Sequence, residues 1–108
     1  MIIENITHAC LKFYFNNKIL ITDPWIVEDP IKAGMIYKLP RMRSKPMDIV
    51  KNVDYCYISH THEDHFHVPS LKLFSKKTKF FIPDFSHHKK GRRGEVMFQT
   101  LKKMGFYK

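Results

Sequence analysis

A histidine-rich segment that directly follows an apolar run constrains the fold of this chain more than any other feature. Residues 60–65 read His-Thr-His-Glu-Asp-His, and residues 54–59 before them are largely apolar. A continuous apolar run of this length is typical of a strand buried on both faces of a sheet. In α/β folds, sites lie just beyond the carboxyl ends of such strands. The sequence therefore predicts a site at the end of a buried strand.

The spacing within this segment predicts metal ligands. Residues two apart in an extended chain point to the same side, so His60 and His62 can reach one ion. Asp64 is in phase with them, whereas His65 is out of phase and can approach a second ion beside the first. Imidazole and carboxylate are ligands that zinc and similar ions use. A polar loop would explain one histidine, but four ligand-type residues in six positions favour a metal site.

The N-terminal part of the chain predicts a β-hairpin. Residues 6–15 alternate in the manner of a strand, with Leu11 and Phe13 on one face, and residues 18–22 resume an apolar pattern. Between them Asn16-Asn17 supplies residues that tolerate a positive φ. Asp23-Pro24 ends the second strand because proline cannot continue a ladder.

The remainder of the chain alternates between helix and strand patterns. We expect an irregular proline-rich loop over residues 24–46 and a short helix over 47–53. A second helix should begin at Pro69 with Leu71 and Phe74 facing inward, and a buried strand over 79–83 and a polar loop over 84–94 should follow it. A final helix should run from about 95 to 104, with Val96, Met97 and Leu101 on its buried side and Gly105 as its C-cap. This order predicts an α/β fold with a mixed sheet and flanking helices. The length of 108 residues fits one domain, residues 1–108.

Charge and cysteine content limit the function classes. Lys and Arg number 19 against 10 Asp and Glu, a net charge of +9, which is compatible with nucleic acid, an acidic surface or an anionic substrate. The basic residues are scattered, so solvated surface explains most of them and nucleic acid is disfavoured. Cys10 and Cys56 form no C-x-x-C pair and are interpreted as buried free thiols. The sequence shows neither a signal-peptide pattern nor a membrane-spanning run, which predicts a cytoplasmic protein.

Three patches carry a resemblance to a known family. The run from His60 to His65 resembles the metallo-β-lactamase superfamily, and this motif is highly specific. Thr7-His8-Ala9-Cys10 and Leu20-Ile21-Thr22-Asp23-Pro24-Trp25 resemble the branch that contains L-ascorbate-6-phosphate lactonases, N-acylphosphatidylethanolamine phospholipase D and relatives of the sialic acid hydroxylases. Residues 58–67 with the following Pro-Ser-Leu helix are most similar to the last of these. The resemblance runs nearly end to end, although its motifs occupy only these patches.

The resemblance implies an αββα sandwich of which this chain would form the N-terminal half, so that the domain would be incomplete. By the family pattern His60 and His62 would bind the first metal ion, and Asp64 and His65 the second. Further histidines and a bridging aspartate would come from later segments. Asp23 would orient a ligand from behind, and Asp64 could also manage a proton as a catalytic residue.

The same resemblance implies a metal-dependent hydrolase. Two ions, expected to be zinc with Mn²⁺ or Fe²⁺ as alternatives, would activate hydroxide to attack an ester, lactone, amide or phosphodiester bond. The substrate would be a small molecule, and the net charge is compatible with an anionic one. Each ion would have only two protein ligands within this sequence, fewer than the three of a catalytic zinc site, so the segment alone is expected to be inactive.

The sequence also offers two candidate pocket residues and two alternative functions. His8 and Trp25 are candidates for the wall of the pocket, with core packing as the alternative for each. A truncated, non-catalytic metal-binding module that forms an oligomer with another chain is one alternative function. A nucleic-acid-processing member of the superfamily is the other. The sequence contains no Cys/His motif of the kind an iron–sulfur oxygenase would need.

Overall fold

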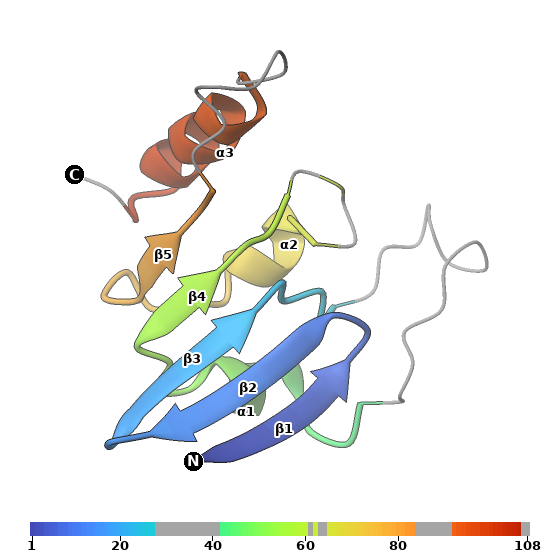
Figure 1. The fold of residues 1–108 in the computed structure, drawn as a ribbon. Coiled ribbons are helices and arrows are strands. Elements are labelled where there is room, and N and C mark those ends of the chain that lie inside the picture. Colours follow the sequence, from blue (N-terminus) through green and yellow to red (C-terminus); the bar gives the residue numbers. More distant parts are fainter. Residues whose placement is uncertain (28–41, 61, 63–64, 84–91, 107–108) are drawn as a thin grey trace.

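The structure is a computed structural model that describes residues 1–27, 42–60, 62, 65–83 and 92–106. Most of the proline-rich loop and of the polar loop before the last helix, together with Asp64, therefore lies outside the described residues. The elements are β1 (Ile2–Thr7), β2 (Cys10–Phe15), β3 (Lys18–Thr22), α1 (Pro46–Val50), β4 (Tyr55–Tyr57), α2 (Val68–Leu71), β5 (Lys79–Phe81) and α3 (Arg92–Lys103). Figure 1 shows the sheet with α1 and α2 on one side of it.

The strands form one mixed sheet in the order β1-β2-β3-β4-β5. β1, β2 and β3 pair antiparallel, and β3, β4 and β5 pair parallel. The parallel part places the carboxyl ends of β3 and β4 next to each other, with Thr22 opposite Tyr57. The expected α/β class with a mixed sheet and flanking helices is confirmed.

The expected hairpin is confirmed and gains a strand. Asn16 and Asn17 join β2 to β3 with φ values of +45° and +61°, as a tight turn between twisted strands requires. The prediction of one continuous strand over residues 6–15 is wrong, because the chain turns back at His8-Ala9 and residues 2–7 form a separate antiparallel strand. His8 holds a φ of +51° in that turn.

The core lies between one face of the sheet and the three helices. Ile21, Cys56 and Phe80 line that face in matching register on the parallel strands and are buried. The helices contribute Ile49 and Val50 from α1, Leu71 from α2, and Met97 and Leu101 from α3. Apolar side chains at these positions bury together, which fixes which face of each element is turned inward.

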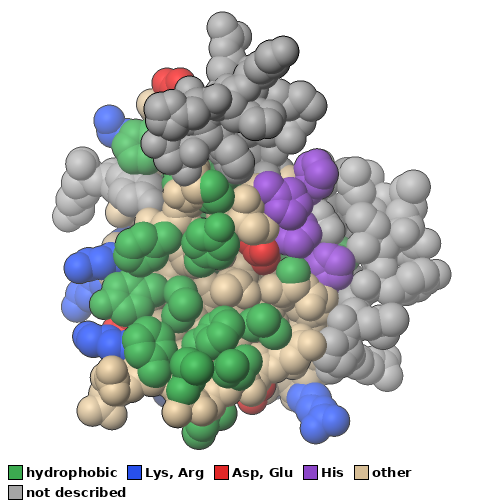
Figure 2. Space-filling view, viewed as in Figure 1, with side chains coloured by type: hydrophobic (Ala, Val, Ile, Leu, Met, Phe, Trp, Pro, Cys, Tyr) green, Lys and Arg blue, Asp and Glu red, His purple; other side chains and the backbone are tan. Residues whose placement is uncertain are grey.

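The opposite face of the sheet is apolar and uncovered in the described part of the chain. Tyr57 is 39% exposed and Phe81 52% exposed, so the expectation that β4 and β5 are buried on both faces is wrong for this structure. A shallow apolar pocket on this face is lined by Leu20, Tyr55, Tyr57 and Phe81. Figure 2 shows hydrophobic side chains gathered there in one patch.

The helices agree with their predicted signals, with one exception. Leu71 and Phe74 are buried as expected, although α2 is only one turn long. Gly105 follows α3 with a φ of +94°, and its amide bonds the carbonyl of Lys102 at 3.0 Å, which is the C-cap geometry that favours glycine. Val96 was predicted on the buried side, but it is 57% exposed. No helix in the described part of the chain is both long and apolar enough to cross a membrane.

Candidate metal centre

The candidate ligands gather where β3 and β4 end. Asp23 follows β3 directly, and Ser59 and His60 lie two and three residues beyond β4. The backbone links these ends, since the Asp23 amide donates to the Tyr57 carbonyl at 2.9 Å. His65 lies in the connection between β4 and α2.

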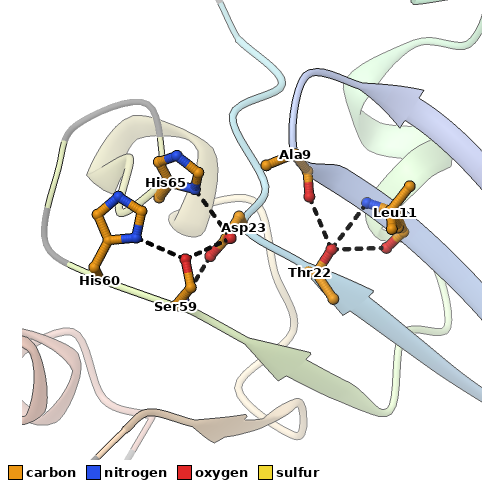
Figure 3. A network of polar contacts seen from close by, with 7 residues as sticks. All are labelled: Ala9, Leu11, Thr22, Asp23, Ser59, His60 and His65. Atoms are coloured by element: carbon orange, nitrogen blue, oxygen red, sulfur yellow. Dashed lines mark hydrogen bonds and ion pairs between the residues drawn. The ribbon is translucent and has the colours of Figure 1, made fainter.

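Asp23 is the centre of a hydrogen-bond network. Its carboxylate accepts the Ser59 amide on Oδ1 at 2.7 Å and the Ser59 hydroxyl on Oδ2 at 2.7 Å. The same Oδ2 lies 3.0 Å from Nδ1 of His65. Figure 3 shows these contacts converging on one buried carboxylate. This arrangement matches a carboxylate that holds an imidazole in a fixed orientation.

The three described imidazoles of the segment lie together. The ring of His60 has its centroid 3.9 Å from that of His65 and 4.7 Å from that of His62. The reason is a turn, in which the amides of His65 and Phe66 bond the carbonyl of His62 at 2.9 and 2.7 Å. The extended chain assumed from sequence would have separated His65 from His60, whereas the turn returns it to the same spot.

The contacts on the imidazoles fit a metal centre in part. Nδ1 of His60 lies 2.8 Å from the Ser59 hydroxyl, and Nδ1 of His65 faces Asp23. Metal-bound histidines characteristically use one ring nitrogen for the ion and the other for such a partner. Among the described residues, however, no group of three or more His, Cys, Asp or Glu side chains is placed to hold an ion. Asp64, predicted as a ligand and as catalytic, lies outside them.

His8 and Trp25 stand beside this cluster. The His8 ring lies 5.4 Å from the His65 ring and 5.3 Å, edge to face, from the Trp25 ring. Trp25 is 4% exposed, so it packs into the protein while its ring borders His8. Figure 2 shows histidine side chains grouped at the upper right of the apolar patch.

Sequence reasoning missed Ser59, which joins Asp23 to His60, and Ser70, which contacts His67. The Ser70 hydroxyl accepts the amides of Ile26 and Val27 at 2.9 and 3.3 Å and lies 2.8 Å from Nδ1 of His67. The bonds from the Ile26 and Val27 amides to the Ser70 hydroxyl hold the segment after β3 against α2. The position of Ser59 next to His60 was visible in the sequence, but only the fold shows that its hydroxyl turns toward Asp23.

The cysteines are not part of the site. Cys10 and Cys56 are free and fully buried, as expected. Burial raises the pKa of Cys10 to about 12, with the charge of Asp23 adding to the effect. Burial also raises the pKa of Cys56 well above its usual value. Both are neutral thiols, which are poor metal ligands and poor nucleophiles.

Residues 3–105 match the sequence profile of the beta-lactamase superfamily domain. The chain therefore belongs to the beta-lactamase superfamily, and its fold is that of the N-terminal portion of a metallo-β-lactamase domain.

Curated relatives and a solved structure are also similar to this chain. A cytidine monophosphate-N-acetylneuraminic acid hydroxylase from Danio rerio is 31% identical over 102 residues, which are 93% of this chain and 16% of that protein. One from Asterias rubens is 33% identical over 66% of this chain and 11% of that protein. Isothiocyanate hydrolase from Delia radicum gut bacteria superposes with a TM-score of 0.65 at 19% identity, over 96% of this chain and 38% of that one. The chain thus spans less than a fifth of those hydroxylases.

Proposed function

We propose that this chain carries metal-binding residues of a metal-dependent hydrolase, with zinc as the expected ion. The observation that carries the proposal is the buried carboxylate of Asp23, which bonds Nδ1 of His65 directly and reaches Nδ1 of His60 through Ser59. Support of this kind behind clustered imidazoles is characteristic of metal centres. Superfamily membership supports the same conclusion.

His60, His62 and His65 would bind the metal, together with Asp64. A bound divalent ion would supply an acidic water and polarise the bond that is attacked. In this proposal Asp23 and Ser59 orient imidazoles, and His8 and Trp25 border the substrate. Two ions remain part of the proposal, as does a proton-handling role for Asp64.

A small anionic molecule is the proposed substrate class. The net charge of +9 is compatible with an anion. The similarity to hydroxylases named for cytidine monophosphate-N-acetylneuraminic acid, which is itself anionic, points in the same direction. The bond proposed for hydrolysis is an ester, lactone, amide or phosphodiester.

Metal binding is tested first. The metal-free chain is dialysed against Zn²⁺, and bound metal is measured by mass spectrometry in the wild type and in the variant H62A. The His62 side chain is exposed, so its removal should leave the fold intact. We expect stoichiometric zinc in the wild type and a clear loss in H62A. The chain unfolded in urea is the control, because it keeps all seven histidines without their geometry. Equal binding by folded and unfolded chains would contradict the proposal.

Hydrolysis is tested separately on the zinc-loaded chain. A chromogenic carboxylic ester, a lactone, an amide and a phosphodiester are assayed with and without a chelator. No turnover is expected of this chain alone, because it supplies only two protein ligands to each ion, fewer than the three of a catalytic zinc site. Turnover of any of these substrates that the chelator abolishes and Zn²⁺ restores would contradict this expectation and show that these ligands suffice for hydrolysis.

A metal-binding module that assembles with another chain is the second candidate function. The apolar sheet face that carries Leu20, Tyr55, Tyr57 and Phe81 favours it, since exposed apolar patches of this kind mark contact surfaces. Sedimentation analysis of the zinc-loaded chain distinguishes the two candidates. Bound zinc, a mass above that of one chain and no turnover would support the module. A monomer with turnover would exclude it.

A further inference from the structure

We propose that Ser59 is a positioning residue that decides which ring nitrogen of His60 carries the proton. The Ser59 hydroxyl lies between two partners, 2.7 Å from Oδ2 of Asp23 and 2.8 Å from Nδ1 of His60. Figure 3 shows the Ser59 hydroxyl between the His60 ring and the Asp23 carboxylate. The effect of Ser59 on metal binding rests on the proposed function, whereas its effect on the position of the His60 proton does not.

The placement follows from counting protons. A carboxylate has only acceptors, and a serine hydroxyl has one proton to donate. The short contact between Ser59 and Asp23 therefore uses the hydroxyl proton. Toward His60 the hydroxyl oxygen can then only accept, so Nδ1 of His60 must carry the hydrogen. The neutral ring of His60 consequently presents the lone pair of Nε2.

The same carboxylate imposes the same tautomer on His65. Oδ2 of Asp23 faces Nδ1 of His65 at 3.0 Å, and this acceptor requires a hydrogen on that nitrogen. One buried side chain thus sets two imidazoles, His65 by direct contact and His60 through the Ser59 hydroxyl. Neutral imidazole binds metal ions through a lone pair, so both rings offer Nε2 for that purpose.

The backbone geometry makes Ser59 testable without removing its structural contact. The Ser59 amide, which is independent of the side chain, donates to Oδ1 of Asp23 at 2.7 Å. Replacement by alanine keeps this bond and removes only the hydroxyl. Replacement by threonine keeps both. S59A and S59T are therefore a matched pair that differs in the presence of the hydroxyl between Asp23 and His60.

The first measurement is the tautomer of His60 in the metal-free protein. Nitrogen-15 NMR of labelled imidazoles, above about pH 8 where ordinary histidines are neutral, distinguishes hydrogen on Nδ1 from hydrogen on Nε2. We expect Nδ1–H for His60 and His65 in the wild type and in S59T. In S59A we expect His60 to shift toward Nε2–H, the commoner form in water, while His65 stays unchanged. Nε2–H for His60 in the wild type would overturn the proposal.

The second measurement is the affinity for Zn²⁺. S59A should bind about 10–100-fold more weakly than the wild type, the usual effect of losing such a partner, and S59T should bind within a few fold of it. Zinc affinity unchanged in S59A would overturn the metal consequence. If the wild type fails to bind zinc while its His60 carries hydrogen on Nδ1, the proposed function fails and the role of Ser59 in proton placement stands.

Discussion

Asp23 and His8 combine a left-handed backbone with a side chain that reaches the candidate site. Their φ values are +37° and +51°, and the other non-glycine residues with positive φ in the described part of the chain are Asn16, Asn17 and Asn52. Asparagine tolerates this region best among residues with a side chain, and those three lie at turns. Asp23 bonds His65, and the His8 ring lies beside it. Costly backbone conformations of this kind cluster at functional sites.

Replacement of Asp23 by asparagine should damage the site while keeping the backbone. Asparagine fits a positive φ, but its amide group would direct N–H donors at the Ser59 hydroxyl or at Nδ1 of His65. We expect a loss of about 1–3 kcal/mol in unfolding free energy, since a buried donor faces a donor, and weaker zinc binding. Urea unfolding and zinc titration measure the two effects.

The matched control for this substitution is N16D, the reverse exchange at another left-handed position, because Asn16 is exposed in a turn. It should change neither quantity beyond about 0.5 kcal/mol. A loss in N16D equal to that in D23N would show that the backbone, not the carboxylate network, explains the effect.

The two buried cysteines predict a stability that falls at high pH. Burial raises the pKa of Cys10 to about 12 and that of Cys56 well above its usual value, whereas in the unfolded chain both thiols ionise near pH 8.5. Above about pH 9 the unfolded state therefore loses protons that the folded state keeps, and unfolding becomes easier. Each thiol contributes up to about 1.4 kcal/mol per pH unit.

Urea unfolding from pH 7 to 10.5 measures this dependence in the wild type and in the double variant C10A/C56A. The wild type should lose stability more steeply than the variant above pH 9, since tyrosines and lysines titrate in both proteins. Slopes that coincide would contradict the burial of the thiols.

At the scale of elements, β5 shows what an apolar run can and cannot predict. The sequence predicted a strand at residues 79–83 from the run Phe80-Phe81-Ile82, and the structure has the shorter strand Lys79–Phe81 there. It predicted burial on both faces, yet Phe80 is 5% exposed and its neighbour Phe81 is 52% exposed. The pattern reports that both faces are apolar, whereas burial depends on what packs against each face.

This difference gives a prediction on adjacent residues of one strand. F80A should cost about 3–5 kcal/mol in unfolding free energy, because it empties a packed core position. F81A should cost roughly 1 kcal/mol or less, as expected of a position that is half exposed. Urea unfolding of the two variants provides the comparison, and each variant controls for the other. Equal losses would mean that the second face is also covered.

The connection from β4 to α2 marks the limit of sequence reasoning about the site. The ligand types at His60, His62 and His65 were predicted from the sequence, and the structure gathers these three rings. Their division between two ions rested on an extended chain, and it stays a prediction. The role of Ser59 could not be predicted, because it depends on the parallel pairing that places Asp23 beside the end of β4.

For the whole molecule, bound zinc should act as a stabilising ligand. A ligand at 100 times its dissociation constant adds about 2.7 kcal/mol to the unfolding free energy when it binds only the folded state. For a chain of this size the melting temperature should rise on the order of 10 °C. Thermal unfolding with Zn²⁺, with Mg²⁺ as the control ion, measures the shift. A rise of the same size in H62A would show that the zinc acts elsewhere.

The bond between Asp23 and Ser59 joins positions 36 residues apart, and this separation affects the order of events during folding. Neither strand end can orient the imidazoles before β3 and β4 have paired, and closing such a long loop is a slow step. Zinc added to the unfolded chain should therefore leave the rate of refolding almost unchanged, and it should slow unfolding instead. The ion would then stabilise the folded state after it has formed and would not direct the folding of the chain.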